Sequence, residues 1–160
     1  MEQVTKYFDA EKFESIFFVF SGIIAIILAC YFIFVLKKPF QNGIAFSFAA
    51  IALIQIVVGT SVYFRSPKDI DRINQLIQTD KAKIQSEEIP RMKVVMKNFT
   101  HYKYIEIALI LTGIGLLLLF RNDITKGVGL GLAIQSSIML LLDFIAAARG
   151  DNYLRFLQSL

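Results

Sequence analysis

Hydrophobic residues in this chain gather into four long stretches, and most charged residues lie between them. The stretches with almost no charge are 15–36, 43–64, 104–120 and 127–148. Only Glu106 interrupts the third stretch, and only Asp143 interrupts the fourth. An α-helix rises about 1.5 Å per residue, so ~20 apolar residues cross the ~30 Å hydrocarbon core of a bilayer. The pattern therefore predicts four transmembrane helices.

Composition agrees with this pattern. Hydrophobic residues make up 56% of the chain and the mean hydropathy is +0.58, both above the values of soluble domains. A soluble four-helix bundle would carry a polar stripe along each helix, whereas these stretches are apolar all round. We therefore expect an all-α integral membrane protein whose 160 residues form one four-span domain.

The connections between the stretches predict the topology. Six-residue loops join the first span to the second and the third to the fourth, which predicts two antiparallel hairpins. Four crossings place both termini and the central segment 66–103 on one side, together with 13 of the 17 lysines and arginines. By the positive-inside rule this side is cytoplasmic, and we expect the membrane to be the bacterial cytoplasmic (inner) membrane.

The central segment 66–103 has the pattern of an amphipathic helical hairpin. Ser66 and Pro67 are typical of a helix start, as N-cap and first residue. Isoleucines then follow on one face at positions 70, 73, 77 and 84, and a second helix is expected to begin at Pro90. Either that helix continues directly into the third span, or residues 90–103 lie flat on the membrane. In the second case, four basic residues would contact anionic lipid: Arg91, Lys93, Lys97 and Lys103.

The two hairpins resemble each other. Residues near the first and third spans match at an offset of 91, for example Ser21-Gly22-Ile23 and Thr112-Gly113-Ile114. Residues 43–65 match 127–149 at an offset of 84, so the hairpins would differ by seven residues around their turns. A true duplication would be a parallel repeat about an axis along the membrane normal.

Asp143 is the first candidate for a functional residue, because an ionisable side chain inside a span usually faces the protein interior and finds a partner. It shares a helix face with Gln135, and the matching face of the second span carries Gln55. These residues form either a polar pathway or interhelical hydrogen bonds, and the second interpretation is favoured. Glu106 is expected to lie at a similar depth. Charge partners or lipid headgroup contacts are expected from Arg65, Arg149 and Lys103.

The sequence gives little support to catalysis. His101 is the only histidine and Cys30 the only cysteine, so the usual Cys/His metal sites are excluded. There is no glycine-rich phosphate loop and no nucleophile elbow. We therefore expect no enzyme, no metal and no cofactor.

Two functions remain. The first is an interaction or regulatory module of accessory, immunity or sensor type, which assembles through small-residue seams and an open apolar stripe on its cytoplasmic hairpin. The seams are Gly127/Gly131 and Gly22/Ala25/Ala29. The alternative is an oligomeric pore or ion channel lined by the polar faces of spans 2 and 4. Expected partners are the bilayer and either further copies or another membrane protein. Nucleic acid is not expected, because the basic residues flank the spans, where anionic lipid is the simpler partner.

Overall fold

The computed structural model describes residues 2–79 and 81–160 and is built almost entirely of helix. Helix α1 (Glu2–Tyr31) ends in a π-helical turn, η1 (Phe32–Leu36), and is followed by α2 (Pro39–Thr79). The short elements α3 (Lys81–Lys83) and η2 (Ile84–Glu88) lead into α4 (Ile89–Leu119), and α5 (Asp123–Gln158) completes the chain. Four helices are long and apolar enough to cross a membrane, namely α1 with η1, α2, η2 with α4, and α5. The all-helical prediction is confirmed.

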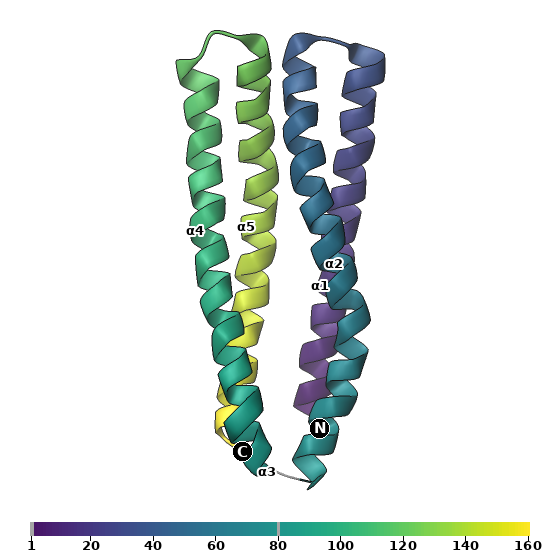
Figure 1. Ribbon diagram of the computed structural model, residues 1–160, viewed down its shortest axis with the longest axis vertical. Coiled ribbons are helices and arrows are strands. Elements are labelled where there is room, and N and C mark those ends of the chain that lie inside the picture. The colour runs from purple at the N-terminus through teal and green to yellow at the C-terminus, as the bar shows by residue number, and fades with distance from the viewer. Residues whose placement is uncertain (1, 80) are drawn as a thin grey trace.

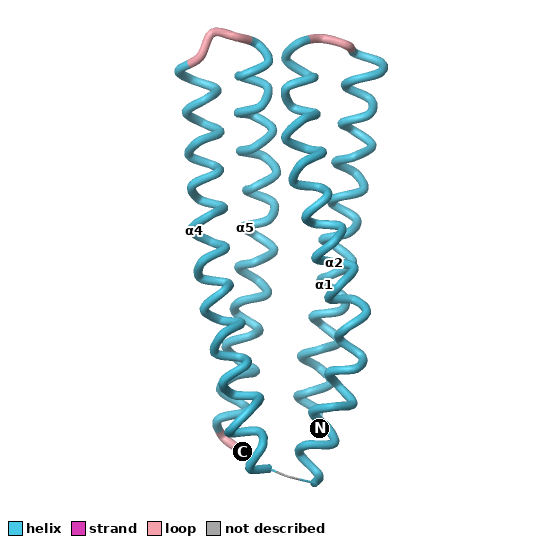
Figure 2. Tube along the Cα trace, in the orientation of Figure 1, coloured by secondary structure: helices cyan, strands magenta, loops and turns pink. Residues whose placement is uncertain are grey.

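The helices lie as two adjacent pairs, α1 with α2 and α4 with α5 (Figure 1). Away from the chain termini they form a row in the order α1, α2, α5, α4, so α2 and α5 are central and run in the same direction. Short turns close one end of both pairs (Figure 2). We call this the turn end, and the opposite end, which carries both termini, the terminal end. In its apolar half, α4 therefore has α5 as its only neighbour in the row.

Different local chemistry shapes the two turns. In the first turn, Lys37 has a φ of 53°, in the left-handed region, and its N–H donates to the Phe32 carbonyl. In the second turn, the Asn122 side chain caps α5 by accepting hydrogen bonds from the N–H groups of Ile124 and Thr125, at 2.8 and 3.2 Å. These caps satisfy backbone groups that helix ends leave unpaired.

The seam between α2 and α5 is close and reciprocal. Gly43 lies against the backbone of Ile124 and Gly127, and Gly127 lies against the backbone of Phe40 and Gly43. A Cβ atom at either glycine would collide with a carbonyl oxygen of the other helix. The two contacts are equivalent: Gly43 corresponds to Gly127 and Phe40 corresponds to Ile124, each pair being 84 residues apart. The seam therefore has local two-fold symmetry.

The same offset of 84 extends to the outer helices, which corrects the register expected from the sequence. Gly22 of α1 packs against Ala52 and Gln55, whereas Gly113 of α4 packs against Gly129 and Ala133. Gly22 thus lies farther from its turn than Gly113 does from its own, and the two glycines are not structural equivalents. The seven-residue difference around the turns is also wrong, because the helices before the turns end at Leu36 and Leu119, 83 residues apart, and the helices after them begin 84 residues apart. The residues that match at an offset of 91 therefore do not occupy equivalent places in the two hairpins.

The terminal end has its own hydrophobic core, formed by residues from all four long helices and η2. Its buried members are Val4, Tyr7, Phe8, Ile73, Ile84, Met92, Tyr153 and Leu157. The apolar stripe of the central segment belongs to this core and is covered by the two ends of the chain. The expectation that this stripe is open was therefore wrong.

The central segment departs from the predicted hairpin in one further respect. No helix starts at Ser66, because α2 runs unbroken through Pro67 to Thr79. The Ser66 hydroxyl is buried and lies 2.9 Å from the Val62 carbonyl of the preceding turn, so Ser66 is an interior residue of the helix and not its N-cap. Of the two alternatives for residues 90–103, the continuous helix is the one observed, since α4 is unbroken from Ile89 to Leu119.

Candidate functional site

The first polar contact predicted inside the spans joins the two central helices. The side-chain amide of Gln135 on α5 donates to the Oε1 atom of Gln55 on α2 at 2.7 Å. Both side chains are buried, at 2% and 0% exposure. This is the interhelical hydrogen bond expected of polar residues in an apolar bundle. It lies in the same seam as the reciprocal glycines and binds the two helix pairs to each other.

The second polar contact joins α5 to α4. Asp143 and Glu106 are buried, at 7% and 2% exposure, and their carboxyl groups lie close enough to interact electrostatically. Lys103, one turn before Glu106, is the positive group that acts on both carboxyls. Its Nζ atom lies 5.1 Å from the centre of the Phe144 ring, above the ring face. We call Glu106 and Asp143 the carboxyl pair.

Glu106 lacks the hydrogen-bond donors that buried carboxylates normally have. Neither oxygen of Glu106 has a hydrogen-bond donor within the described part of the chain. A shallow groove of about 490 Å³ opens beside the pair, between α4 and α5, and Lys103 and Phe144 are among its lining residues. The pair is thus buried between α4 and α5, and the residues that follow the two acids in the chain, Ile107 and Phe144, line the groove.

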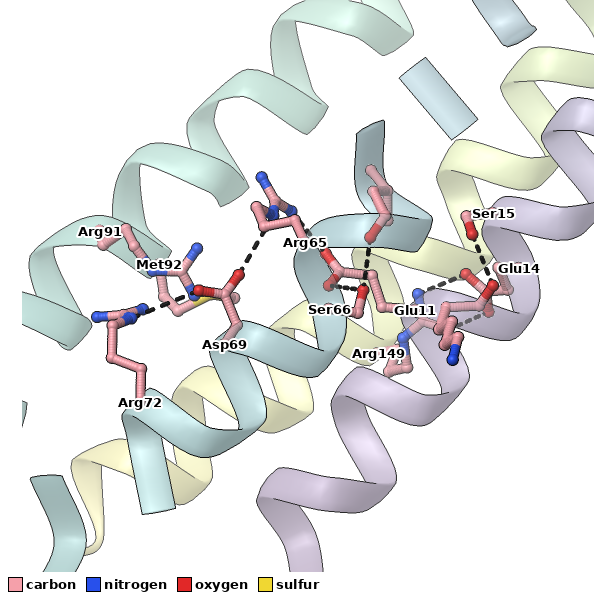
Figure 3. Close-up of polar contacts among 12 residues, drawn as sticks. Glu11, Glu14, Ser15, Arg65, Ser66, Asp69, Arg72, Arg91, Met92 and Arg149 are labelled. Carbon is pink, nitrogen blue, oxygen red and sulfur yellow. Dashed lines mark hydrogen bonds and ion pairs between the residues drawn. The ribbon is translucent and has the colours of Figure 1, made fainter. Parts of the chain in front are cut away.

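Two of the three predicted charge partners are found elsewhere. Arg65 and Arg149 were expected to pair with Asp143 or Glu106 or to contact lipid headgroups. Arg65 binds Glu11 at 3.1 Å and Arg149 binds Glu14 at 2.5 Å, so neither pairs with Asp143 or Glu106 (Figure 3). Contact with lipid headgroups stays a prediction, and the Arg65 side chain is 50% exposed. Of the three, Lys103 is the one that acts on the carboxyl pair.

These arginines belong to a network of ion pairs across the terminal end. Glu11 of α1 accepts from Arg65 and from the Ser66 hydroxyl, each at 3.1 Å, and Arg65 also binds Asp69 at 3.2 Å (Figure 3). Burial raises the pKa of Glu11, although Arg65 and Ser66 favour its charged form. The network joins α1 to α2 directly beyond their apolar stretches.

The network continues through a fully buried glutamate. Asp69 binds Arg72 at 3.4 Å, and Arg72 donates to Oε2 of Glu88 at 2.9 Å. Arg91 donates to both oxygens of Glu88, at 2.6 and 2.9 Å. Glu88 is 0% exposed, so one carboxylate without water holds two guanidinium groups from α2 and α4. Charge-assisted bonds of this kind are the strong class of hydrogen bond.

An aromatic cluster packs beside the network. The rings of Tyr7 and Tyr153 stack with centroids 4.1 Å apart, and the Arg149 guanidinium lies 5.6 Å from the Tyr7 ring centre. Burial raises the pKa of both tyrosines, and the negative charge of Glu11 adds to the shift at Tyr7. The two termini of the chain are thereby held together.

Sequence reasoning missed Glu11, Glu14 and Glu88. Their partners lie mostly on other helices, so spacing along the chain cannot reveal them. Three pairs in the network have the spacing of neighbours on a helix face: Arg65 with Asp69, Asp69 with Arg72, and Glu88 with Arg91.

The described residues contain no group of three or more histidine, cysteine, aspartate or glutamate side chains that could hold a metal ion. The polar groups therefore divide into an internal hydrogen bond, a buried carboxyl pair and a structural network of ion pairs. Comparisons of the chain with protein-family models, with characterised proteins and with solved structures gave no match.

Proposed function

We propose that this chain is a small membrane interaction or regulatory module that crosses the membrane four times and assembles through its outer helix α4. In this proposal the terminal end, with both termini and the central segment 66–103, faces the cytoplasm of a bacterial cell. Support comes from the length and apolarity of the four helices and from the many basic residues at the terminal end.

The surfaces first expected to drive assembly are used within the chain. Gly127 and Gly131 pack against α2, and Gly22 packs against α2 from the other side. Ala25 and Ala29 are buried in the core between α1 and α2. The apolar stripe of the central segment is covered by the chain ends. A partner must therefore bind a different surface.

The observation that carries the proposal is the uncovered face of α4. Among the described residues, the apolar half of α4 packs against α5 and against no other long helix. Ala108 and Thr112 are exposed, and Gly115 has no neighbouring atom within 4 Å of a Cβ placed on it. These small residues recur at helical spacing and would let a second helix approach closely, as small residues do at helix contacts in membranes. The expected occupant is α4 of a second copy, giving a two-fold dimer.

Native mass spectrometry in mild detergent tests this proposal. Wild-type protein should be dimeric, and the double variant Ala108→Leu/Gly115→Leu should be monomeric because the added side chains hold the helices apart. Ala50→Leu, which enlarges an exposed alanine on α2, is the matched control and should stay dimeric. A monomeric wild type contradicts self-assembly. If that monomer also brings no partner down in cross-linked membranes, the module itself is refuted.

The alternative, a pore lined by the polar faces of spans 2 and 4, gains nothing from the structure. Gln55 and Gln135 bond to each other inside the chain and are not exposed to a neighbouring copy. Lining a pore would require α2 and α5 to separate at their closest seam. Absence of conductance in planar bilayers at high protein load is the expected result.

A further inference from the structure

The carboxyl pair presents a problem of charge. Glu106 and Asp143 face each other between α4 and α5, almost completely removed from solvent. Two neighbouring like charges repel each other, and an ionised carboxylate in an apolar medium loses its hydration. Lys103 supplies one positive charge, and no other charged side chain of the described residues on α4 or α5 acts on both carboxyls. With both acids ionised, the group would carry one uncompensated negative charge.

The hydrogen bonding of the carboxyl pair indicates that a proton supplies the positive charge that the group lacks. An ionised carboxylate can only accept hydrogen bonds, so two ionised carboxylates cannot bond to each other. Neither Glu106 oxygen has a donor among residues 2–79 and 81–160. A proton on one carboxyl group would make that group a donor to the other. The same proton would cancel the excess negative charge.

We propose that Glu106 and Asp143 form a proton-binding site that holds one proton between their carboxyl groups, with Lys103 compensating the remaining charge. A proton suits the site better than a metal ion, because no third acidic, histidine or cysteine ligand joins the pair in the described chain. Calcium takes six to eight oxygen ligands and magnesium about six, more than two carboxyl groups supply. Ile107 and Phe144, which follow the two acids in the chain, line the shallow groove between α4 and α5 together with Lys103, whereas the acids themselves do not.

The position of the site also follows from the two-fold relation between the helix pairs. At an offset of 84, Glu106 corresponds to Gly22 and Asp143 corresponds to Gly59. In the first pair, both glycines let α1 and α2 pack closely, with Gly22 against Ala52 and Gly59 against Ser15. In the second pair, the same two places carry the acids. At these two positions the second pair therefore has acidic side chains where the first pair has glycines that allow close packing. Close packing of the helices alone does not require acids there.

Infrared spectroscopy of the purified protein in lipid tests the proposal directly, because a protonated carboxyl group has a carbonyl stretch that a carboxylate lacks. At neutral pH, wild-type protein should show one protonated carboxyl per chain, since exposed acids are ionised. Glu106→Gln and Asp143→Asn should each remove that signal, because the remaining acid can then ionise beside Lys103. Glu87→Gln, which changes an exposed glutamate, is the control and should retain the signal.

Three results would overturn the proposal. The first is a wild-type spectrum without a protonated carboxyl at neutral pH, which needs no variant and so does not depend on how the variants fold. The second is a signal that persists in either single variant, which would assign the proton to one isolated acid. The third is loss of the signal when sodium replaces choline at constant pH, which would assign the site to an alkali cation. The dimer experiment above does not involve these residues, so the two proposals fail separately.

Discussion

Glu88 offers a test of how firmly the terminal end is held. We consider Glu88→Gln, which keeps the size of the side chain and removes its charge. The carboxylate accepts three hydrogen bonds, one from Arg72 and two from Arg91, and has no exposure to water. Glutamine keeps one acceptor oxygen and places an amide donor against guanidinium donors. The change therefore leaves two positive charges facing a group that cannot compensate them.

The magnitude follows from the exposure of the partners. Breaking a buried ion pair by removing one member costs about 3–5 kcal/mol when the remaining charge stays dry. Here the side chains of Arg91 and Arg72 are 30% and 39% exposed, so water can hydrate part of each guanidinium once Glu88 is neutral. This screening reduces the cost. We expect Glu88→Gln to lower the free energy of unfolding by about 2–3 kcal/mol, between the dry value and that of an exposed pair.

Reversible unfolding in mixed micelles, followed by helical circular dichroism, measures this loss. Glu87→Gln is the matched control, since the neighbouring side chain is exposed and a surface change of this kind costs less than about 0.5 kcal/mol. A double-mutant cycle with Arg72→Gln should show a coupling energy of about 0.5–3 kcal/mol, as for residues in one network. The reasoning is refuted if Glu88→Gln and Glu87→Gln are equally stable.

Three further predictions use the same unfolding assay or a titration. Gly127→Ala should cost about 1–3 kcal/mol because its Cβ would push α2 and α5 apart, while Gly115→Ala, which meets no atom, should cost nothing; equal losses would contradict the seam. Gln55→Leu should cost only ~0.6 kcal/mol, the average for a hydrogen bond inside a membrane, and a loss above about 2 kcal/mol would show a larger role. Because burial raises the folded-state pKa of Tyr7 and Tyr153, their contribution to stability is complete below the ordinary tyrosine pKa of about 10 and is lost as pH rises through the folded-state values. Ultraviolet titration should therefore find fewer ionised tyrosines near pH 11 in the folded protein than in the unfolded chain, and Tyr7→Phe/Tyr153→Phe should abolish that difference.

The number and type of the helices could be predicted because long apolar stretches determine them locally. The polar contact between Gln55 and Gln135 was also accessible, since helical spacing placed each on a polar face. Pro67 shows where local signals fail. A proline is typical of a helix start, but Pro67 lies inside α2. The helix loses one backbone hydrogen bond there and is stabilised by its packing along α1.

The charge partners could not be predicted for a related reason. Arg65 and Arg149 occupy equivalent places after their apolar stretches, which suggested equivalent roles with the intramembrane acids. Their actual partners, Glu11 and Glu14, both lie in the first half of α1, far away in sequence. Which acid an arginine meets depends on how the termini fold back onto the central segment, and no periodicity within one helix contains that information.

The reciprocal glycine seam has a consequence for how the molecule can be assembled. An interface in which the same residues meet from both sides is the kind that two identical chains make when they form a dimer. Here two unequal hairpins make it, so the protein is in effect a covalent dimer of hairpins. Each hairpin carries half of a self-complementary surface and can insert and close before the halves dock, in the two stages by which membrane helices associate. Cut within the central segment and produced as two separate polypeptides, the halves should find each other in the same membrane and rebuild the seam.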